Sequence, residues 1–378
     1  MKITIIGAGI GGITTAIALE KKGFNVEIFE SFSKMKRIGA GIVLANNAMQ
    51  VYRRLNLTDE IHKKSNHISR LNIVDEQLDI LSQVKLEGFE KRFDAHYRSI
   101  HRGDLQELLI KNLTSTKLHF GKKLKNIIER ENDIQVFFED GTSHHTDVLI
   151  GADGINSVVR NHLFPKTSIR NAKQVCWRGI TRVSIPTRFL KELNESWGNG
   201  RRFGIVPLVD NEVYWFALTN YKNDFRKEFS IEDLPHLFQS FHPIVQQILA
   251  STSKENIITN EINDLKPFAP WHHNKICLIG DAAHATTPNM GQGACQAIED
   301  ALALSICLEK ENTPEEAFSS FQKLRTKKAN GIISQSWQVG KLAQLENGFV
   351  RKSRNFFMKL VPASIGEKQS AKILELDY

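Results

Sequence analysis

The chain has 378 residues, of which 41% are hydrophobic and 24% charged, close to ordinary globular usage. This excludes a mainly disordered, collagen-like or disulfide-scaffold protein, and the length predicts two or three folding units. Fifty Lys and Arg against 42 Asp and Glu give 50 − 42 = +8. The basic residues are scattered, which indicates a solvated basic surface and no nucleic-acid partner, although a positive field favours anionic small molecules.

The four cysteines, Cys176, Cys277, Cys295 and Cys307, form no CxxC pair, so they signal neither a zinc site nor a dithiol. Free thiols are typical of a reducing compartment. The apolar N-terminus fits a first strand better than a signal peptide, and no apolar run approaches the length of a membrane span. We therefore expect a cytoplasmic protein without a metal site and without stable membrane insertion.

The first thirty residues read as strand, helix and strand. Residues 3–6 and 26–29 are short apolar runs, and residues 10–22 carry apolar side chains at helical spacing before Gly23. This βαβ unit predicts a parallel sheet with a right-handed crossover.

Helices and strands are both expected between this unit and residue 150. Residues 46–64 and 101–112 look helical, and residues 70–86 alternate like strands. Three short strands, separated by turn signals, form a meander that returns to the main sheet: 127–129, 134–138 and 147–150.

Tryptophan and phenylalanine residues among β-type runs mark a change of texture between residues 170 and 270. Strands are expected at 203–208 and 213–218 and a helix at 231–249. A further apolar strand at 275–281 precedes two or more helices.

The predicted fold class is α/β, with three parts. A discontinuous Rossmann-like domain takes residues 1–170 and 271–320. A β-sheet-rich domain, expected to bind the substrate, is inserted at 171–270. A C-terminal helical segment follows at 321–378.

The first motif is GAGIGG at residues 7–12, between the first strand and the first helix. Gly7 permits the tight turn, Gly9 removes a Cβ that would block a pyrophosphate, and Gly12 lets the helix approach the strand. Phosphates then lie at the helix N-terminus. Glu30 ends the second strand and can accept hydrogen bonds from ribose hydroxyls, so the motif favours FAD or NAD over NADP.

Two later strands also run into small residues. GADG at 151–154 is followed by Arg160, and by itself could be a simple turn. GDAAH at 280–284 is followed by GQGA at 291–294. Asp281 could hold a sugar-like hydroxyl chain, and a helix that starts near the second glycine of GQGA would aim its positive end at an anion.

The three motifs, in this order and at these separations, resemble those of the single-component flavoprotein monooxygenases, the aromatic-ring hydroxylases of the para-hydroxybenzoate hydroxylase type. The resemblance covers nearly the whole chain. It is closest to the salicylate hydroxylase, FAD-dependent urate hydroxylase and zeaxanthin epoxidase group, with the tetracycline-inactivating monooxygenases nearby. Supporting stretches are GAGI at 39–42, HRGDL at 101–105, WRG at 177–179 and ESWGNGRRFG at 195–204.

The resemblance implies FAD bound across the Rossmann-like domain. Gly9 and Gly12 would face the pyrophosphate, and Glu30 the adenosine ribose. Arg102 would reach the phosphates or the ribityl chain. Asp153 belongs to a motif that the family links to both FAD and NAD(P)H.

The third motif would lie by the flavin itself. Asp281 would bind the ribityl or phosphate region, and Gly293 and Ala294 would lie by the isoalloxazine. Pro288 and the small residues around it would shape the oxygen site. The implied reaction uses NADPH or NADH and O₂ to hydroxylate a small aromatic or heteroaromatic substrate through a flavin C4a-hydroperoxide.

Substrate contacts are expected from the inserted sheet. Arg202 and Tyr214 are the candidates, because an Arg and a Tyr in similar stretches of urate-hydroxylase-like members touch the substrate. Arg178 is a third candidate, for which a salt bridge is the favoured interpretation. An arginine can hold a carboxylate or oxyanion with two hydrogen bonds.

Other functions stay open at this point. The same chemistry could act on a larger polyketide-like or isoprenoid substrate, including a polycyclic antibiotic such as tetracycline, or by epoxidation. A non-catalytic flavin-binding partner and a plain NAD dehydrogenase are alternatives of other classes. We expect a monomer or homodimer. The basic, amphipathic tail at 347–360 could touch a membrane surface, although packing on the core is the safer interpretation.

Overall fold

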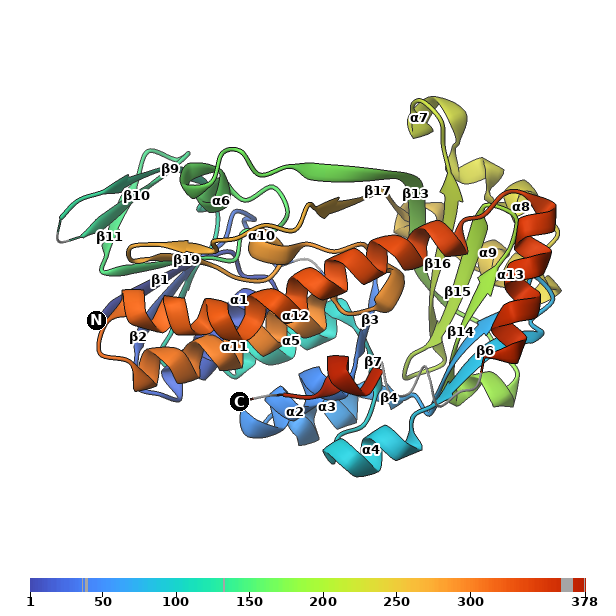
Figure 1. The fold of residues 1–378 in the computed structure, drawn as a ribbon, viewed down its shortest axis with the longest axis horizontal. Coiled ribbons are helices and arrows are strands. Elements are labelled where there is room, and N and C mark those ends of the chain that lie inside the picture. The colour runs from blue at the N-terminus through green and yellow to red at the C-terminus, as the bar shows by residue number, and fades with distance from the viewer. Residues whose placement is uncertain (36, 38–39, 132, 362–369, 377) are drawn as a thin grey trace.

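The computed structural model describes residues 1–35, 37, 40–131, 133–361, 370–376 and 378. Figure 1 shows one sheet near the N-terminus, a second sheet at the opposite end of the molecule, and the long helix α12 (Pro314–Ala343) running from the first towards the second. The predicted α/β class is confirmed. Among the described residues, no helix is both long and apolar enough to cross a membrane.

The first sheet has six strands in the order β18-β19-β12-β1-β2-β8. Its central strand β1 pairs in parallel with β2 and β12, and its side chains are buried on one face at Ile3 and Ile5 and on the other at Thr4 and Ile6. Such burial on both faces is typical of parallel sheets covered by helices. The strand bounds are β1 Lys2–Ile6, β2 Asn25–Phe29, β8 Lys117–His119, β12 Val148–Gly151, β18 His272–His273 and β19 Ile276–Leu278.

The second sheet has seven strands in the order β17-β13-β16-β15-β14-β5-β6. Strands β5 and β6 come from residues 70–85, which the sequence analysis placed with the Rossmann-like domain. One face is covered by a core that includes α8 and α9, and the other face turns towards β3. The bounds are β5 Arg70–Val74, β6 Ile80–Lys85, β13 Ile169–Arg182, β14 Glu192–Trp197, β15 Arg201–Pro207, β16 Glu212–Asn220 and β17 Ile258–Leu265.

Two three-stranded sheets complete the strands of the described chain. One has the order β11-β10-β9 and contains the first two strands of the predicted meander together with β11, which was not expected, while the expected third strand at 147–150 is β12 of the first sheet. The other has the order β3-β7-β4. Their bounds are β3 Gly41–Leu44, β4 Ser65–His67, β7 Arg98–His101, β9 Leu124–Glu129, β10 Ile134–Phe138 and β11 Ser143–Thr146.

The helices flank the first sheet and the outer end of the second (Figure 1). Besides α12, their bounds are α1 Ile10–Glu20, α2 Asn46–Arg54, α3 Thr58–Lys64, α4 Glu87–Phe93, α5 Arg102–Lys111, α6 Val158–Leu163, α7 Phe225–Glu228, α8 Leu234–Leu237, α9 Pro243–Ala250, α10 Asp281–His284, α11 Gly293–Lys310 and α13 Gly348–Leu360.

Two of the predicted helices are interrupted. The expected helix at 46–64 is the pair α2 and α3, because Asn56 between them has a φ of 59° that a helix cannot contain. The expected helix at 231–249 is broken into short pieces, and Pro235 and Pro243 each stand in the first turn of a new helix. Proline is tolerated there because its missing N–H would have no partner within the helix.

Candidate active site

The first glycine motif forms an open helix end. At Gly9, the N-cap of α1, an added Cβ would meet no atom within 4 Å. No side chain caps α1, and its first turn holds no acidic residue. Gly12 is different, because its Cβ would lie 2.1 Å from the Gly7 carbonyl oxygen. The turn therefore leaves free N–H groups and open space at Gly9, while Gly12 is required for packing.

The second motif lies directly against the first. A Cβ on Gly7, whose φ is +106°, would come within 2.4 Å of the carbonyl oxygen of Ala152. The carboxylate of Asp153 accepts hydrogen bonds from the Ser157 hydroxyl at 2.5 Å and from the Val158 backbone N–H at 2.7 Å. Burial raises the pKa of Asp153, and these hydrogen bonds oppose the shift. Asp153 thus holds the start of α6 beside the glycine turn.

Glu30 is buried at the end of β2, beside the same turn. Its carboxylate accepts hydrogen bonds from the backbone N–H of Ala8 at 2.7 Å, the backbone N–H of Phe32 at 2.9 Å and the hydroxyl of Ser31 at 3.0 Å. An ionised carboxylate offers about four acceptor positions. Glu30 therefore braces the turn and keeps roughly one acceptor position for a ligand hydroxyl.

The first and the third motif both pack against the same side chain of α11, that of Ala297. Cβ atoms added to Gly11 and to Gly280 would lie 3.0 Å and 3.1 Å from the Cβ of Ala297. The N-terminus of α11, which includes Gly293 and Ala294, has no side-chain cap and no acidic residue in its first turn. Two open helix N-termini, those of α1 and α11, are thereby held close together, and each favours an anion.

A buried polar network fixes the third motif. One oxygen of Asp300 on α11 accepts from the backbone N–H of Gly280 at 2.9 Å and lies 2.5 Å from Nε2 of His284. Arg325 on α12 donates to Asp300 at 2.8 Å and to Glu299 at 2.6 Å. His284 thus has a structural role, because its imidazole is buried and held by Asp300.

Pro288 lies in a turn that α12 anchors. Its side chain is exposed. The amide of Asn289 donates to the Thr287 hydroxyl at 2.9 Å and to the Ser336 carbonyl at 2.8 Å. Gly340 leaves room for this amide, because an added Cβ would lie 2.4 Å from its nitrogen. The turn is therefore rigidly placed between α10 and α11.

Arg202 and Tyr214 share one face of the second sheet. The register pairs Arg202 with Leu218 and Val206 with Tyr214, and alternate residues of each strand point to the same side. Arg178 is paired with Phe216, so it belongs to the same face. We call this side the inner face, because Tyr214 on it packs with Ala40 before β3.

Arg202 is almost completely buried and already has partners. It donates to the carboxylate of Glu195 at 3.1 Å and to the amide oxygen of Gln174 at 3.4 Å. Its Nε finds no partner among the described residues. The indole of Trp197 donates to the same Glu195 oxygen at 3.0 Å. The predicted substrate residue Arg202 therefore lies in a buried polar cluster with Glu195, Gln174 and Trp197.

Arg178 and Tyr214 lie next to residues of the cofactor motifs. Arg178 is half-buried, donates to the side-chain oxygen of Asn260 at 2.6 Å, and keeps an Nε that has no partner in the described chain. Burial raises the pKa of Tyr214, and a hydrogen bond with Arg178 opposes this shift. The side chain of Arg102 is exposed. Desolvation by the surrounding protein nevertheless lowers its pKa. The charge of Arg178 adds to this lowering, and the charge of Asp281 partly offsets it.

Two glycines allow aromatic rings to lie on the inner face. A Cβ on Gly41 of β3 would lie 2.5 Å from Cγ of Tyr214, so this ring packs directly on the backbone of β3. A Cβ on Gly204 would lie 2.1 Å from the ring of Phe216, which therefore covers β15. Phe216 itself stays half-buried, so part of its ring remains uncovered.

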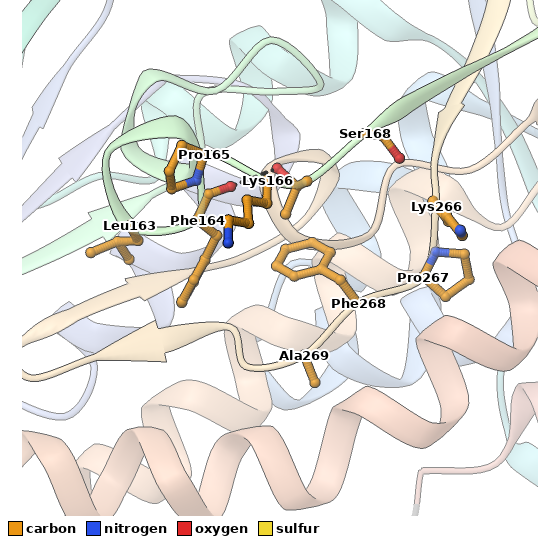
Figure 2. Close-up of a pocket in the computed structure, with 10 residues that line it drawn as sticks. Leu163, Phe164, Pro165, Lys166, Ser168, Lys266, Pro267, Phe268 and Ala269 are labelled. Carbon is orange, nitrogen blue, oxygen red and sulfur yellow. Dashed lines mark hydrogen bonds between the residues drawn. The ribbon is translucent and has the colours of Figure 1, made fainter.

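A separate pocket of about 470 Å³ lies away from these residues. Figure 2 shows the rings of Phe164 and Phe268 beside it, and their centroids are 5.9 Å apart. None of the predicted site residues lines this pocket.

His67, Glu90 and His96 form a separate cluster of potential metal ligands, whose ligand atoms lie within 4.8 Å of one another.

From the sequence, a salt bridge is the favoured interpretation of Arg178, and neither Asn260 nor Phe216 is a candidate site residue. The sequence contains part of the necessary information, because Arg178 lies in a β-type stretch, where buried residues stand on both sides of it. Its pairing with β17, which supplies Asn260, is a contact over some eighty residues that spacing does not reveal.

Comparison with known proteins gives one family, related enzymes that match almost the whole chain, and solved structures of the same fold. The sequence model of the FAD binding domain family matches residues 1–336. The aurachin C monooxygenase/isomerase of Stigmatella aurantiaca is 32% identical over 376 residues, or 99% of this chain and 98% of that protein. The 2-heptyl-3-hydroxy-4(1H)-quinolone synthase of Pseudomonas aeruginosa is 29% identical over 373 residues, covering 96% and 94%. Klebsiella pneumoniae HpxO, solved with FAD and uric acid, shares the fold, with a TM-score of 0.91 at 23% identity and coverage of 99% and 96%.

Proposed function

Because the chain belongs to the FAD binding domain family and is an FAD-dependent monooxygenase, we propose that its substrate is a heteroaromatic ring of the quinolone type. NADPH or NADH and O₂ are the proposed co-substrates. When bound, FAD supplies the redox chemistry, taking a hydride from the nicotinamide and activating O₂. The residues of the chain supply binding, orientation and exclusion of water.

The residues of the three motifs fit FAD. The open N-termini of α1 and α11 offer unpaired N–H groups to anionic or electron-rich parts of a ligand. We assign the pyrophosphate to Gly9, the adenosine ribose to Glu30, and the ribityl region to Arg102 and Asp281. Gly293, Ala294 and Pro288 would border the isoalloxazine, and Asp153 would hold the turn beside Gly7.

The substrate would lie on the inner face. Ile180, Phe216 and Ile258 on this face are only half-buried, so they leave apolar surface for a flat ring and for an alkyl substituent. The relative named after 2-heptyl-3-hydroxy-4(1H)-quinolone favours this class over urate. Tyr214 would contact the ring through its edge or hydroxyl, and its raised pKa keeps the phenol neutral.

The free donor of Arg178 is the observation that carries this proposal. Its Nε is buried without a partner, beside Tyr214 and close to Arg102. A buried donor without a partner costs free energy, which a substrate oxygen would recover. We therefore assign Arg178 to the carbonyl or oxyanion of the ring, and Arg202 to holding Glu195 and the sheet in place.

The domain division given by the sequence, residues 1–170 with 271–320, then 171–270, then 321–378, remains a proposal, except that β5 and β6 belong to the second sheet. The state of association, monomer or homodimer, is likewise a prediction. Size-exclusion chromatography with light scattering measures the latter directly.

The first test is anaerobic stopped-flow reduction of the purified protein by NADPH and by NADH. The panel contains a 2-alkyl-4-quinolone, urate, a phenolic acid and a tetracycline. We expect a yellow protein whose flavin reduction accelerates most with the quinolone. Acceleration by urate or the phenolic acid alone would contradict the proposed ring class. Acceleration by the tetracycline alone would favour the larger-substrate alternative.

Arg178→Gln tests the assigned donor. A hydrogen bond to a charged group contributes about 1.5–3 kcal/mol, so we expect KM for the ring substrate to rise by roughly ten- to a hundredfold while FAD stays bound. Arg182→Gln is the matched control, because Arg182 is on the same strand and its side chain is 74% exposed. Equal KM values for both variants would remove Arg178 from the substrate site.

A further inference from the structure

Exposed apolar side chains gather on α13. Phe349, Phe356, Phe357 and Leu360 are exposed by 82%, 62%, 63% and 61%. Val350 and the following Val361 are exposed by 44% and 55%. Single exposed apolar side chains are ordinary, but several large ones on one short helix mark an interaction surface.

The helix geometry places these side chains on one continuous side. Successive residues of an α-helix turn by about 100°. On that spacing Phe349, Phe356 and Leu360 fall within one narrow stripe, and Phe357 and Val350 fall in the neighbouring stripe. Lys352 and Lys359, both exposed, flank the first stripe. We call the five apolar residues and the two lysines the α13 surface.

The opposite side of α13 is fixed to the protein. Arg354 donates to the carbonyls of Leu342 and Ala343 at 3.1 Å each, and its guanidinium lies 5.2 Å from the ring centroid of Trp197. Arg351 donates to Glu76 at 2.8 Å. The helix is therefore held on the second sheet, and Figure 1 shows it beside β6. The exposed apolar side chains lie on the side of α13 that faces away from these contacts.

The charge of α13 indicates what this surface binds. The helix contains Arg351, Lys352, Arg354 and Lys359 and no acidic residue. If two copies met through the α13 surface about a twofold axis, their lysines would approach one another without an acidic partner on the helix, which is unfavourable. An anionic lipid surface instead accepts the phenylalanines at its acyl boundary and the lysines at its headgroups.

The position of α13 connects it to the substrate sheet. Trp197, below Arg354, is paired with Arg202 across β14 and β15 and shares its face. A membrane bound at α13 would thus lie beside the edge of the sheet whose inner face carries the proposed substrate residues. This arrangement suits a substrate that partitions into lipid.

We propose that the α13 surface docks this protein peripherally on an anionic membrane. The phenylalanines enter the acyl boundary, and Lys352 and Lys359 contact lipid phosphates. The helix lies in the plane of the interface and does not cross it. The proposal concerns binding to lipid and is independent of which ring is hydroxylated.

The test is co-sedimentation of the FAD-loaded, full-length protein with vesicles. Vesicles of phosphatidylcholine are compared with vesicles in which roughly a third of the lipid is phosphatidylglycerol. Each basic residue near such a surface contributes about 1 kcal/mol, so Lys352→Glu with Lys359→Glu should lower the partition coefficient at least about tenfold. High salt should weaken binding of the unmodified protein to the anionic vesicles.

The apolar side is tested by Phe349→Gln, Phe356→Gln and Phe357→Gln together. We expect at least tenfold weaker binding to anionic vesicles, with an unchanged melting temperature and flavin content. The matched control changes Phe120, Ile128 and Leu324, which are exposed apolar residues elsewhere in the fold, to Gln.

Three results would overturn the proposal. The first is an unmodified protein that stays in the supernatant with both kinds of vesicle. The second is equal loss of binding in the control and the α13 variants. The third is light scattering that shows a dimer which the phenylalanine substitutions dissociate, since this would assign the surface to a second copy of the chain.

Discussion

Gly9 and Gly12 are three residues apart, but the absence of a side chain serves ligand space at Gly9 and backbone packing at Gly12. At Gly9 the backbone is extended, with φ −69° and ψ 175°, and an added Cβ would meet nothing. We predict that Gly9→Ala folds with a free energy of unfolding within about 1 kcal/mol of the unmodified protein. FAD affinity should fall at least about tenfold, because the methyl group occupies the space assigned to the pyrophosphate.

Gly12→Ala should behave in the opposite order. Its Cβ would lie 2.1 Å from the Gly7 oxygen, so the protein should lose about 1–3 kcal/mol even without FAD. Thermal melts of the flavin-free proteins, followed by FAD titration, separate the two effects. A Gly9→Ala protein that binds FAD normally would show that the pyrophosphate lies elsewhere.

The candidate site was readable from the sequence only where chemistry follows a local motif. Gly9 and Glu30 stand at fixed positions of a strand–turn–helix, so their places followed from spacing. Tyr214 could be named because its strand resembles in sequence a stretch that contains a substrate-binding tyrosine in urate-hydroxylase-like members of the family. The free donor of Arg178 could not be predicted, because it depends on which atoms of Asn260 and Tyr214 surround it in space.

At the scale of elements, α12 is joined to α11 by a buried charge network. Arg325 lies fully buried between Glu299 and Asp300. Burial alone would raise the pKa of Asp300, but His284 and Arg325 outweigh it, so the pKa is lowered below its ordinary value of about 3.9. Its contribution to stability is therefore present above that pH and lost as the pH falls below it.

We predict that Arg325→Met destabilises the protein by about 3–5 kcal/mol near neutral pH, because two buried carboxylates lose their shared guanidinium and keep only Lys328 and His284 as basic partners. Without the arginine, less opposes the rise that burial causes in the pKa of Asp300, so mild acid protonates this carboxylate and relieves the cost. The difference in melting temperature should thus be larger at about pH 8 than at about pH 5. Lys323→Met, an exposed change on the same helix, is the control.

Elements with local signals were predicted well, and their breaks and partners were not. The helix expected at 10–22 is observed at Ile10–Glu20, ahead of Gly23. The break at Asn56 has no proline or glycine to mark it, because the residue takes a left-handed conformation that asparagine tolerates. The addition of β5 and β6 to the second sheet depends on pairing between residues about 120 positions apart, such as Glu192 with Arg70.

At the scale of the whole molecule, the second sheet meets the three-stranded sheet β3-β7-β4 where the ring of Tyr214 lies on Gly41. An alanine at this position would place its Cβ 2.5 Å from Cγ of the ring. Tyr214 is only 9% exposed, so its ring has little room to move away. We predict that Gly41→Ala lowers the free energy of unfolding by about 1–3 kcal/mol and raises KM for the ring substrate, because it pushes the inner face away from β3.

A double-mutant cycle tests whether this single contact sets the spacing. In a Tyr214→Ala background the ring is absent, so the added penalty of Gly41→Ala should nearly vanish, giving a coupling of about 1 kcal/mol or more. Gly88→Ala is the control, because a Cβ there meets no atom within 4 Å. If Gly41→Ala costs the same with and without the tyrosine ring, its effect is local to β3, and other contacts must hold the substrate sheet over the cofactor motifs.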